Sequence, residues 1–180
     1  MAIHKDFINI FLDFGRNRVY YVEFTKSDLK LEIGARSKPM VVRSFQLSDY
    51  GKITDLLELV LDETCLEETM TAFARQLNWD SGLILVASED EEVLGVMIGT
   101  IHRNKGYYYR VAVHPEHQRR GIARSLMEGM KQRFSHRHIQ NVAVPVDDYN
   151  EQLLPVYEKL GCGEENFNRS YGKLSILAGC

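Results

Sequence analysis

The chain of 180 residues is poor in cysteine, with only Cys65, Cys162 and Cys180, an odd number of widely spaced thiols. A disulfide framework needs paired cysteines, so we expect free thiols in a reducing cytoplasm. No cysteines or histidines have the spacing of zinc ligands, and we expect no metal site. The sequence therefore favours a cytoplasmic protein whose fold rests on an apolar core.

An excess of positive charge and long apolar runs are also missing. Lys and Arg number 22 against 25 Asp and Glu, for a formal charge of -3. Nucleic-acid-binding proteins are usually strongly basic, so no nucleic-acid partner is expected. The apolar stretches are too short to span a bilayer and the N-terminus lacks a signal segment, so no membrane association is expected. The remaining composition, 44% hydrophobic and 26% charged, is that of a globular chain with one main domain.

From Val41 onward, apolar periodicity predicts alternating strands and helices. Strands are expected over residues 41–46, 82–88, 93–101, 107–113 and 141–146, with one or two more within 164–177. Helices are expected over 49–61 (capped by Ser48 or Asp49), 67–77 and 121–135, and a short one begins close to Pro155. The order βααβββαβαβ(β) predicts an α/β fold, a mixed and mostly antiparallel sheet with helices on both faces.

Residues 1–40 have a different pattern from the domain predicted for residues 41–180. The aromatic and β-branched runs at 7–14 and 18–24 flank Gly15-Arg16-Asn17, which predicts a β-hairpin in a β-rich extension. Three roles stay open for it: extending the sheet, covering a cleft, or forming a homodimer contact through an exposed strand edge.

The stretch "HPEHQRRGIARSL", residues 114–126, lies at the junction between a predicted strand and a predicted helix. The first turn of a helix presents unpaired N–H groups and partial positive charge, which together bind anions such as phosphate. Gly121 lets a ligand approach the backbone, and Ala123 keeps the next turn small. Arg119, Arg120 and Arg124 add positive charge. Because the GxxxxGK[ST] and GxGxxG patterns are absent, nucleotide hydrolysis and dinucleotide redox chemistry are disfavoured.

This junction resembles the GNAT N-acetyltransferase superfamily. "QRRGIA" (residues 118–123) is similar to the family's Q/R-x-x-G-x-G/A motif, and it follows "VAVHPEHQ", similar to the usual lead-in. "NEQLLPVYEKLGC" (residues 150–162) is similar to the family's N-x6-Y-E-K-L-G-F signature. The resemblance covers residues 41–177 and implies a GNAT-like acyltransferase fold.

The resemblance also implies acetyl-CoA as co-substrate and an amine of a small molecule or protein as acceptor. The pyrophosphate would rest on backbone amides of the anion-binding junction, and the pantetheine arm would pair with a strand edge. Asn150 would hydrogen-bond the arm, and Tyr157 would protonate the departing thiolate, a task that suits a phenol. The amide of Val113 would polarise the thioester carbonyl. The implied co-substrate-binding residues are Val111, Ala112, Val113, Arg119, Arg120, Gly121, Ile122, Ala123, Arg124 and Asn150.

This chain departs from the family pattern at the position where some members have their general base. Where some members have a glutamate, five residues before the motif asparagine, this chain has Pro145. Asp147, Asp148, His102 and His114 lie nearby in the sequence. We take Asp147 as the candidate catalytic base, with proton removal through water as the alternative.

Two broader alternatives remain. Tyr157 and Asn150, taken singly, also fit a core residue and a helix cap. A non-catalytic acyl-CoA-binding or interaction module on the same fold therefore stays open beside the enzyme. The acidic run "LDETCLEET", residues 61–69, is either a solvated face or an attraction for a cationic acceptor.

Overall fold

The computed structural model describes residues 39–169; the predicted N-terminal hairpin and the tail beyond residue 169 lie outside this range. The described elements follow the predicted order βααβββαβαβ. The strands are β1 (Val41–Ser44), β2 (Ile84–Glu89), β3 (Glu92–His102), β4 (Lys105–Val113), β5 (Val142–Pro145) and β6 (Phe167–Asn168). The helices are α1 (Tyr50–Val60), α2 (Glu63–Asp80), α3 (Ile122–His136) and α4 (Asp148–Lys159).

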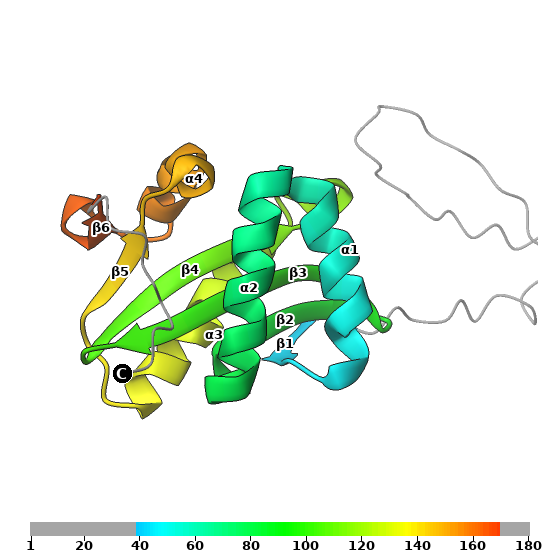
Figure 1. Ribbon diagram of the computed structural model, residues 1–180, viewed down its shortest axis with the longest axis horizontal. Coiled ribbons are helices and arrows are strands. Elements are labelled where there is room, and N and C mark those ends of the chain that lie inside the picture. The colour runs from blue at the N-terminus through cyan, green and yellow to red at the C-terminus, as the bar shows by residue number, and fades with distance from the viewer. Residues whose placement is uncertain (1–38, 170–180) are drawn as a thin grey trace, which may run out of the picture. The chain divides into compact units, whose positions relative to one another are not determined.

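The strands form one mixed sheet in the order β1-β2-β3-β4-β5-β6 (Figure 1). The first four pair antiparallel, whereas β4 with β5 and β5 with β6 pair parallel. The turn between β2 and β3 has positive φ at Asp90 and Glu91, and the turn between β3 and β4 has positive φ at Arg103 and Asn104. Two consecutive residues with positive φ are typical of type I′ turns, which match the twist of the strands that they join. The predicted mixed sheet is confirmed.

Helices cover both faces of the sheet, as predicted, and each face has its own apolar cluster. The row Ile122, Leu126, Met130 and Phe134 recurs every four residues, so one side of α3 is apolar and buries against one face. Helix α1 buries Ile53, Leu56 and Leu57 against the other face, where α2 adds Ala72 and Phe73. The sheet is therefore covered by α3 behind and by α1 and α2 in front in the view of Figure 1.

Strands β4 and β5 separate soon after they meet. They pair only at Gly106 with Val142 and at Tyr107 with Ala143. Figure 1 shows β5 turning away from β4 toward α4 beyond that point. On β4, Tyr109 is the extra residue of an irregularity, since Ile98 pairs with Arg110 and Gly99 with Tyr108. A bulge of this kind increases local twist and bends the strand, which favours the separation.

Two helix boundaries differ from the sequence prediction. Helix α2 begins earlier than residue 67, because the Asp62 carboxylate caps it by accepting from the Cys65 amide at 2.9 Å. The prediction that α4 begins close to Pro155 is wrong, since the helix begins at Asp148 and holds Pro155 in its interior. The Asp147 carboxylate caps it by accepting from the Asn150 amide at 2.7 Å. Tertiary contacts of its first turn, described below, outweigh the missing hydrogen bond at the proline.

The packing of α1 leads to a stability prediction on two leucines of the same helix. Leu57 is fully buried, whereas Leu59 is 57% exposed. We expect Leu57→Ala to lower the free energy of unfolding by about 2–5 kcal/mol through the lost burial and the cavity left behind. Leu59→Ala is the control, with an expected change within about 0.5 kcal/mol. Urea titrations followed by circular dichroism measure both, and equal losses would contradict the assigned orientation of α1.

Candidate active site

The backbone of residues 119–124, from the loop after β4 into the first turn of α3, is the segment predicted to bind an anion and is named the anion cradle below. Arg119 and Gly121 have φ of +62° and +81°, and Gly121 is the N-cap of α3. The first intrahelical bond runs from the Ser125 amide to the Gly121 carbonyl at 3.0 Å. The amides of Ile122, Ala123 and Arg124 precede it and therefore have no partner within the helix. A Cβ on Gly121 would meet no atom within 4 Å, so a ligand has open space to approach the backbone.

The three arginines of the anion cradle differ in their surroundings. Arg120 donates to Glu89 at 2.8 Å and to the His117 ring nitrogen Nδ1 at 3.0 Å. Arg119 and Arg124 are exposed beside the N-terminus of α3. The dipole of a 15-residue helix and these exposed cations both favour an anionic group, such as pyrophosphate, at this position.

The edge of β4 beyond Tyr107 faces the gap left by β5. The His114 amide donates to the Leu94 carbonyl of β3, and backbone groups alternate in direction along a strand. The N–H and C=O groups of Val111 and Val113 therefore point toward the gap. An extended ligand can add to such an edge as a further strand does.

Asn150, in the first turn of α4, bridges the two diverging strands. It is fully buried, and its Nδ2 donates to the Tyr109 carbonyl of β4 at 3.0 Å and to the Pro145 carbonyl of β5 at 2.8 Å. Its Oδ1 has no hydrogen-bond partner among the described residues. A buried acceptor without a partner is costly, so this oxygen calls for a partner from outside the described residues, such as a water molecule or a ligand.

Tyr157 lies farther along α4 and is also fully buried. Its hydroxyl has no hydrogen-bond partner within residues 39–169. Burial raises the pKa of the Tyr157 phenol well above its ordinary value, and the nearby positive charge of Arg110 opposes this effect. The phenol therefore keeps its proton at any ordinary pH, so it is a hydrogen-bond donor and a source of one proton.

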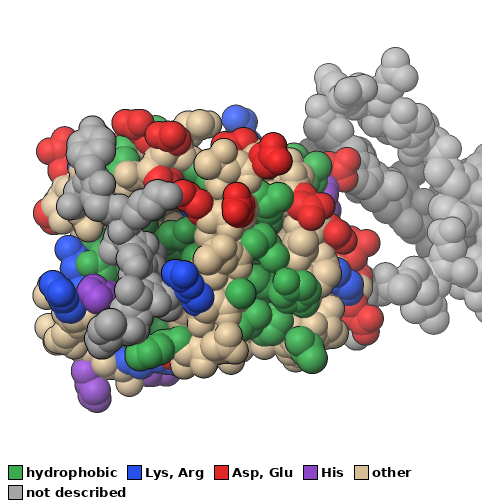
Figure 2. Space-filling model, in the orientation of Figure 1, with side chains coloured by type: hydrophobic (Ala, Val, Ile, Leu, Met, Phe, Trp, Pro, Cys, Tyr) green, Lys and Arg blue, Asp and Glu red, His purple; other side chains and the backbone are tan. Residues whose placement is uncertain are grey.

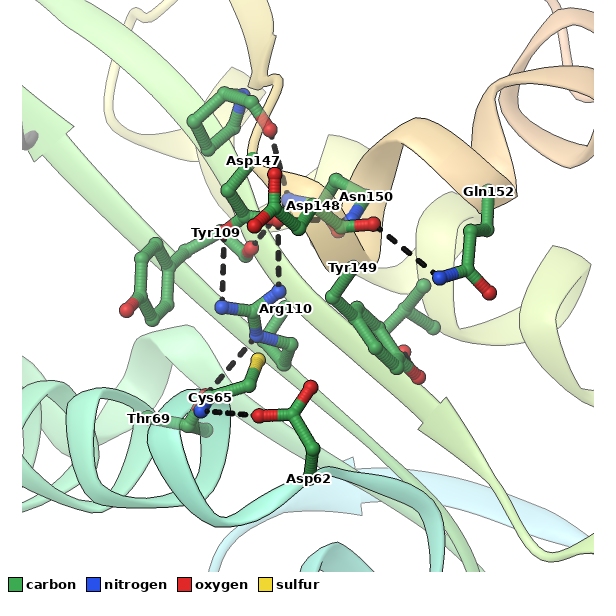
Figure 3. Close-up of polar contacts among 12 residues, drawn as sticks. Asp62, Cys65, Thr69, Tyr109, Arg110, Asp147, Asp148, Tyr149, Asn150 and Gln152 are labelled. Carbon is green, nitrogen blue, oxygen red and sulfur yellow. Dashed lines mark hydrogen bonds and ion pairs between the residues drawn. The ribbon is translucent and has the colours of Figure 1, made fainter. Parts of the chain in front are cut away.

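Arg110 is the central polar residue of the site, and the sequence analysis did not single it out. It lies on β4 and is only 1% exposed. Its Nε donates to Thr69 Oγ1 of α2 at 3.1 Å, and its Nη1 and Nη2 donate to the two oxygens of Asp147 at 3.2 and 2.9 Å. Figure 3 shows the guanidinium between the rings of Tyr109 and Tyr149, whose centroids lie 5.0 and 4.9 Å away. The one available signal was a charged residue inside the apolar strand "YYYRVAV".

Burial alone would lower the pKa of the Arg110 guanidinium, but the hydrogen bonds and charge of Asp147 outweigh it and raise the pKa. Arg110 thus remains charged. Asp147 Oδ1 accepts from Arg110 and from the Asn150 amide, while Oδ2 accepts from Arg110. Asp147 therefore links β4 to α4, and both of its carboxylate oxygens already accept hydrogen bonds.

The other sequence candidates for a base lie in different places. His102 pairs with Lys105 at the far end of the β3–β4 hairpin from Val113, so the register removes it from the gap. His114 accepts from the Glu116 amide through Nδ1 at 3.3 Å, in the loop before the anion cradle. Asp148 is exposed at the start of α4.

The family model described as Acetyltransferase (GNAT) family matches residues 53–162, more than half of the chain. The chain therefore belongs to the GNAT acetyltransferase family, and acyltransferase activity is supported at the level of that family.

Solved structures share the fold at low sequence identity. The NatC complex bound to Gag peptide and CoA has a TM-score of 0.57 and 21% identity, over 68% of this chain and 83% of that one. The PaiA N-acetyltransferase of Thermoplasma acidophilum, in complex with coenzyme A, has a TM-score of 0.54 and 16% identity, over 68% and 88%. The ribosomal-protein-S18-alanine N-acetyltransferase of Escherichia coli has a TM-score of 0.54 and 19% identity, over 68% and 76%.

The described residues fit an acyl-CoA ligand. The anion cradle suits a pyrophosphate, the free edge of β4 suits the amides of a pantetheine arm, and both lie on the same strand–loop–helix unit. Within residues 39–169, no three His, Cys, Asp or Glu side chains are grouped to hold a metal ion, and no helix has the length and apolarity to cross a membrane.

The Arg110–Asp147 pair leads to a second prediction. Asp147→Asn keeps the shape and one accepting oxygen but leaves the buried guanidinium without its counter-charge. We expect the free energy of unfolding to fall by about 2 kcal/mol, below the cost for a fully buried pair because Asp147 is 38% exposed. The neighbouring Asp148→Asn also removes an acid from the first turn of α4, and we expect it to cost less than about 0.5 kcal/mol. Thermal and urea unfolding of both variants test this; equal losses would remove the special role of Asp147.

Proposed function

We propose that this protein is an N-acetyltransferase that transfers the acetyl group of acetyl-CoA directly to an amine. The observation that carries the proposal is the gap between β4 and β5. The anion cradle follows β4, and α4, which follows β5, holds two buried polar atoms without a partner among the described residues, Asn150 Oδ1 and the Tyr157 hydroxyl. A site that holds phosphates at one end and two unsatisfied polar atoms at the other suits a CoA thioester.

Backbone groups make most of the proposed contacts with the co-substrate, and charged side chains add to them. The amides of residues 119–124 hold the pyrophosphate, with Arg119 and Arg124 adding attraction. The edge of Val111, Ala112 and Val113 holds the pantetheine arm, and Asn150 Oδ1 accepts from it. The Val113 amide lies at the end of this edge, where it polarises the thioester carbonyl.

Acetyl-CoA supplies the activated acyl group, and the protein supplies position and a proton. Burial raises the pKa of the Tyr157 phenol, so Tyr157 is protonated in the free protein. It donates a hydrogen bond and then its proton to the departing sulfur, and the proton that water removes from the amine restores the phenol. Because both Asp147 oxygens are engaged by Arg110 and Asn150, we propose that Asp147 positions α4 and that water removes the proton of the amine. The deep burial of Tyr157 keeps bulk water from competing for its proton.

The surface beside the gap favours a cationic acceptor. Figure 2 shows acidic side chains gathered along the edge formed by α4 and the adjoining ends of α1 and α2. The exposed acids of these segments are Asp62, Glu63, Glu67, Glu68, Asp148 and Glu151. An acidic rim raises the local concentration of cationic amines and speeds their arrival.

A second candidate function is a non-catalytic acyl-CoA-binding module on the same fold. The engagement of Asp147 favours it, since both oxygens of this candidate base already accept hydrogen bonds from Arg110. Thiol release from acetyl-CoA, measured with a panel of cationic and neutral amines, separates the two. Binding without release for any amine would favour the module.

Gly121 provides a test of the anion cradle. We expect Gly121→Ala to weaken acetyl-CoA binding at least about tenfold, or about 1.4 kcal/mol, since the added methyl projects toward the ligand and strains a φ of +81°. Gly161→Ala is a matched control, because Gly161 has a φ of +94° with equally open surroundings and lies after α4. Isothermal titration measures both affinities. Equal weakening would assign the effect to backbone strain and not to the anion cradle.

Tyr157 provides a test of the chemistry. We expect Tyr157→Phe to lower kcat by about 10²-fold, the contribution typical of a general acid, while the Kd for acetyl-CoA changes less than about twofold. Loss of the orphaned hydroxyl from the apolar core is expected to leave the fold intact or slightly more stable. Thiol release and isothermal titration give the two values. An unchanged kcat would remove Tyr157 as the acid.

A further inference from the structure

Beyond Tyr107, backbone pairing between β4 and β5 is replaced by side chains from the start of α4. Asn150 reaches the Tyr109 carbonyl, and the Tyr149 hydroxyl donates to the Val111 carbonyl at 3.1 Å. The two contacts differ in kind. Asn150 is fully buried and ties β4 to β5, whereas Tyr149 is half-buried and its hydroxyl bonds to β4 alone.

The Tyr149 ring is held independently of its hydroxyl. The ring stacks on the Arg110 guanidinium, which is itself fixed by Thr69 and Asp147. Burial raises the pKa of the Tyr149 phenol, with the charge of Arg110 opposing it, so the hydroxyl stays a donor. Replacing the hydroxyl by hydrogen therefore removes one hydrogen bond while the stack on Arg110 remains.

The Val111 carbonyl is also a group that a pantetheine amide would use. An extended arm pairing with this edge needs acceptors for its N–H groups, and the carbonyl of Val111 faces the gap. From this overlap we propose that Tyr149 sets the affinity for acetyl-CoA by competing, through its hydroxyl, with the pantetheine arm for the Val111 carbonyl. This inference rests on the proposed function, because it concerns the same binding edge.

The expected change in the Kd for acetyl-CoA follows from the one hydrogen bond that the Tyr149 hydroxyl gives up when the pantetheine arm binds. A neutral hydrogen bond has a net value of about 0.5–1.5 kcal/mol, which corresponds to about a twofold to tenfold change in Kd. Tyr149→Phe removes the competitor, so acetyl-CoA is expected to bind about twofold to tenfold more tightly. If the Tyr149 hydroxyl instead contacted the ligand, Tyr149→Phe would weaken acetyl-CoA binding.

The experiment is isothermal titration of the full chain with acetyl-CoA and with adenosine 3′,5′-bisphosphate, which lacks the arm. Tyr149→Phe is expected to lower the Kd for acetyl-CoA alone. Tyr109→Phe, whose ring stacks on the same guanidinium at 5.0 Å, is the control and is expected to change neither Kd. Tyr149→Leu removes both ring and hydroxyl, and tighter acetyl-CoA binding is expected there as well.

Unchanged or weaker binding of acetyl-CoA by Tyr149→Phe would overturn the proposal, as would an equal change for both ligands. The wild-type titration separates this from the proposed function. If the wild type binds acetyl-CoA, only the role of Tyr149 is at stake; if it does not bind at millimolar ligand, the proposed function fails as well.

Discussion

The ion pair between Arg110 and Asp147 joins the parts of the molecule that the separation of β4 from β5 would leave apart. A sheet that opens loses backbone hydrogen bonds, and a buried guanidinium is costly unless it is paired with an opposite charge. Asp147 pairs with Arg110 and also caps α4, and Asn150 in the first turn of that helix bonds to the carbonyls of both strands. The position of α4, and with it Asn150 and Tyr157, depends on that arrangement.

The two ends of the gap have opposite electrostatic character. The anion cradle combines the N-terminus of α3 with exposed arginines, while the edge near α2 and α4 is lined with acids. In the proposed function, an anionic co-substrate and a cationic acceptor would be drawn to different ends of this opening. Between them the groups are neutral or paired: a protonated phenol, an amide oxygen and the Arg110–Asp147 ion pair.

Most of the fold could be predicted from local pattern. The element order and the apolar row of α3 follow from periodicities that any single element carries in its own residues. The start of α4 could not, because Pro155 locally favours a first turn, whereas the cap at Asp147 and the buried bonds of Asn150 favour an earlier one. Contacts between distant elements decided that boundary.

By itself, the sequence determined the candidate anion cradle, since Gly121 and the helix after it form a local unit whose backbone groups point outward whatever the rest of the chain does. It also placed Asn150 and Tyr157 on one segment. The tertiary structure alone decided what surrounds them. Arg110 lies on β4, Thr69 on α2, and Asp147 and Tyr149 at the start of α4. Neither the contacts among these three elements nor the engagement of both Asp147 oxygens can be read from spacing along the chain. Long-range packing against a diverging pair of strands brought these side chains together.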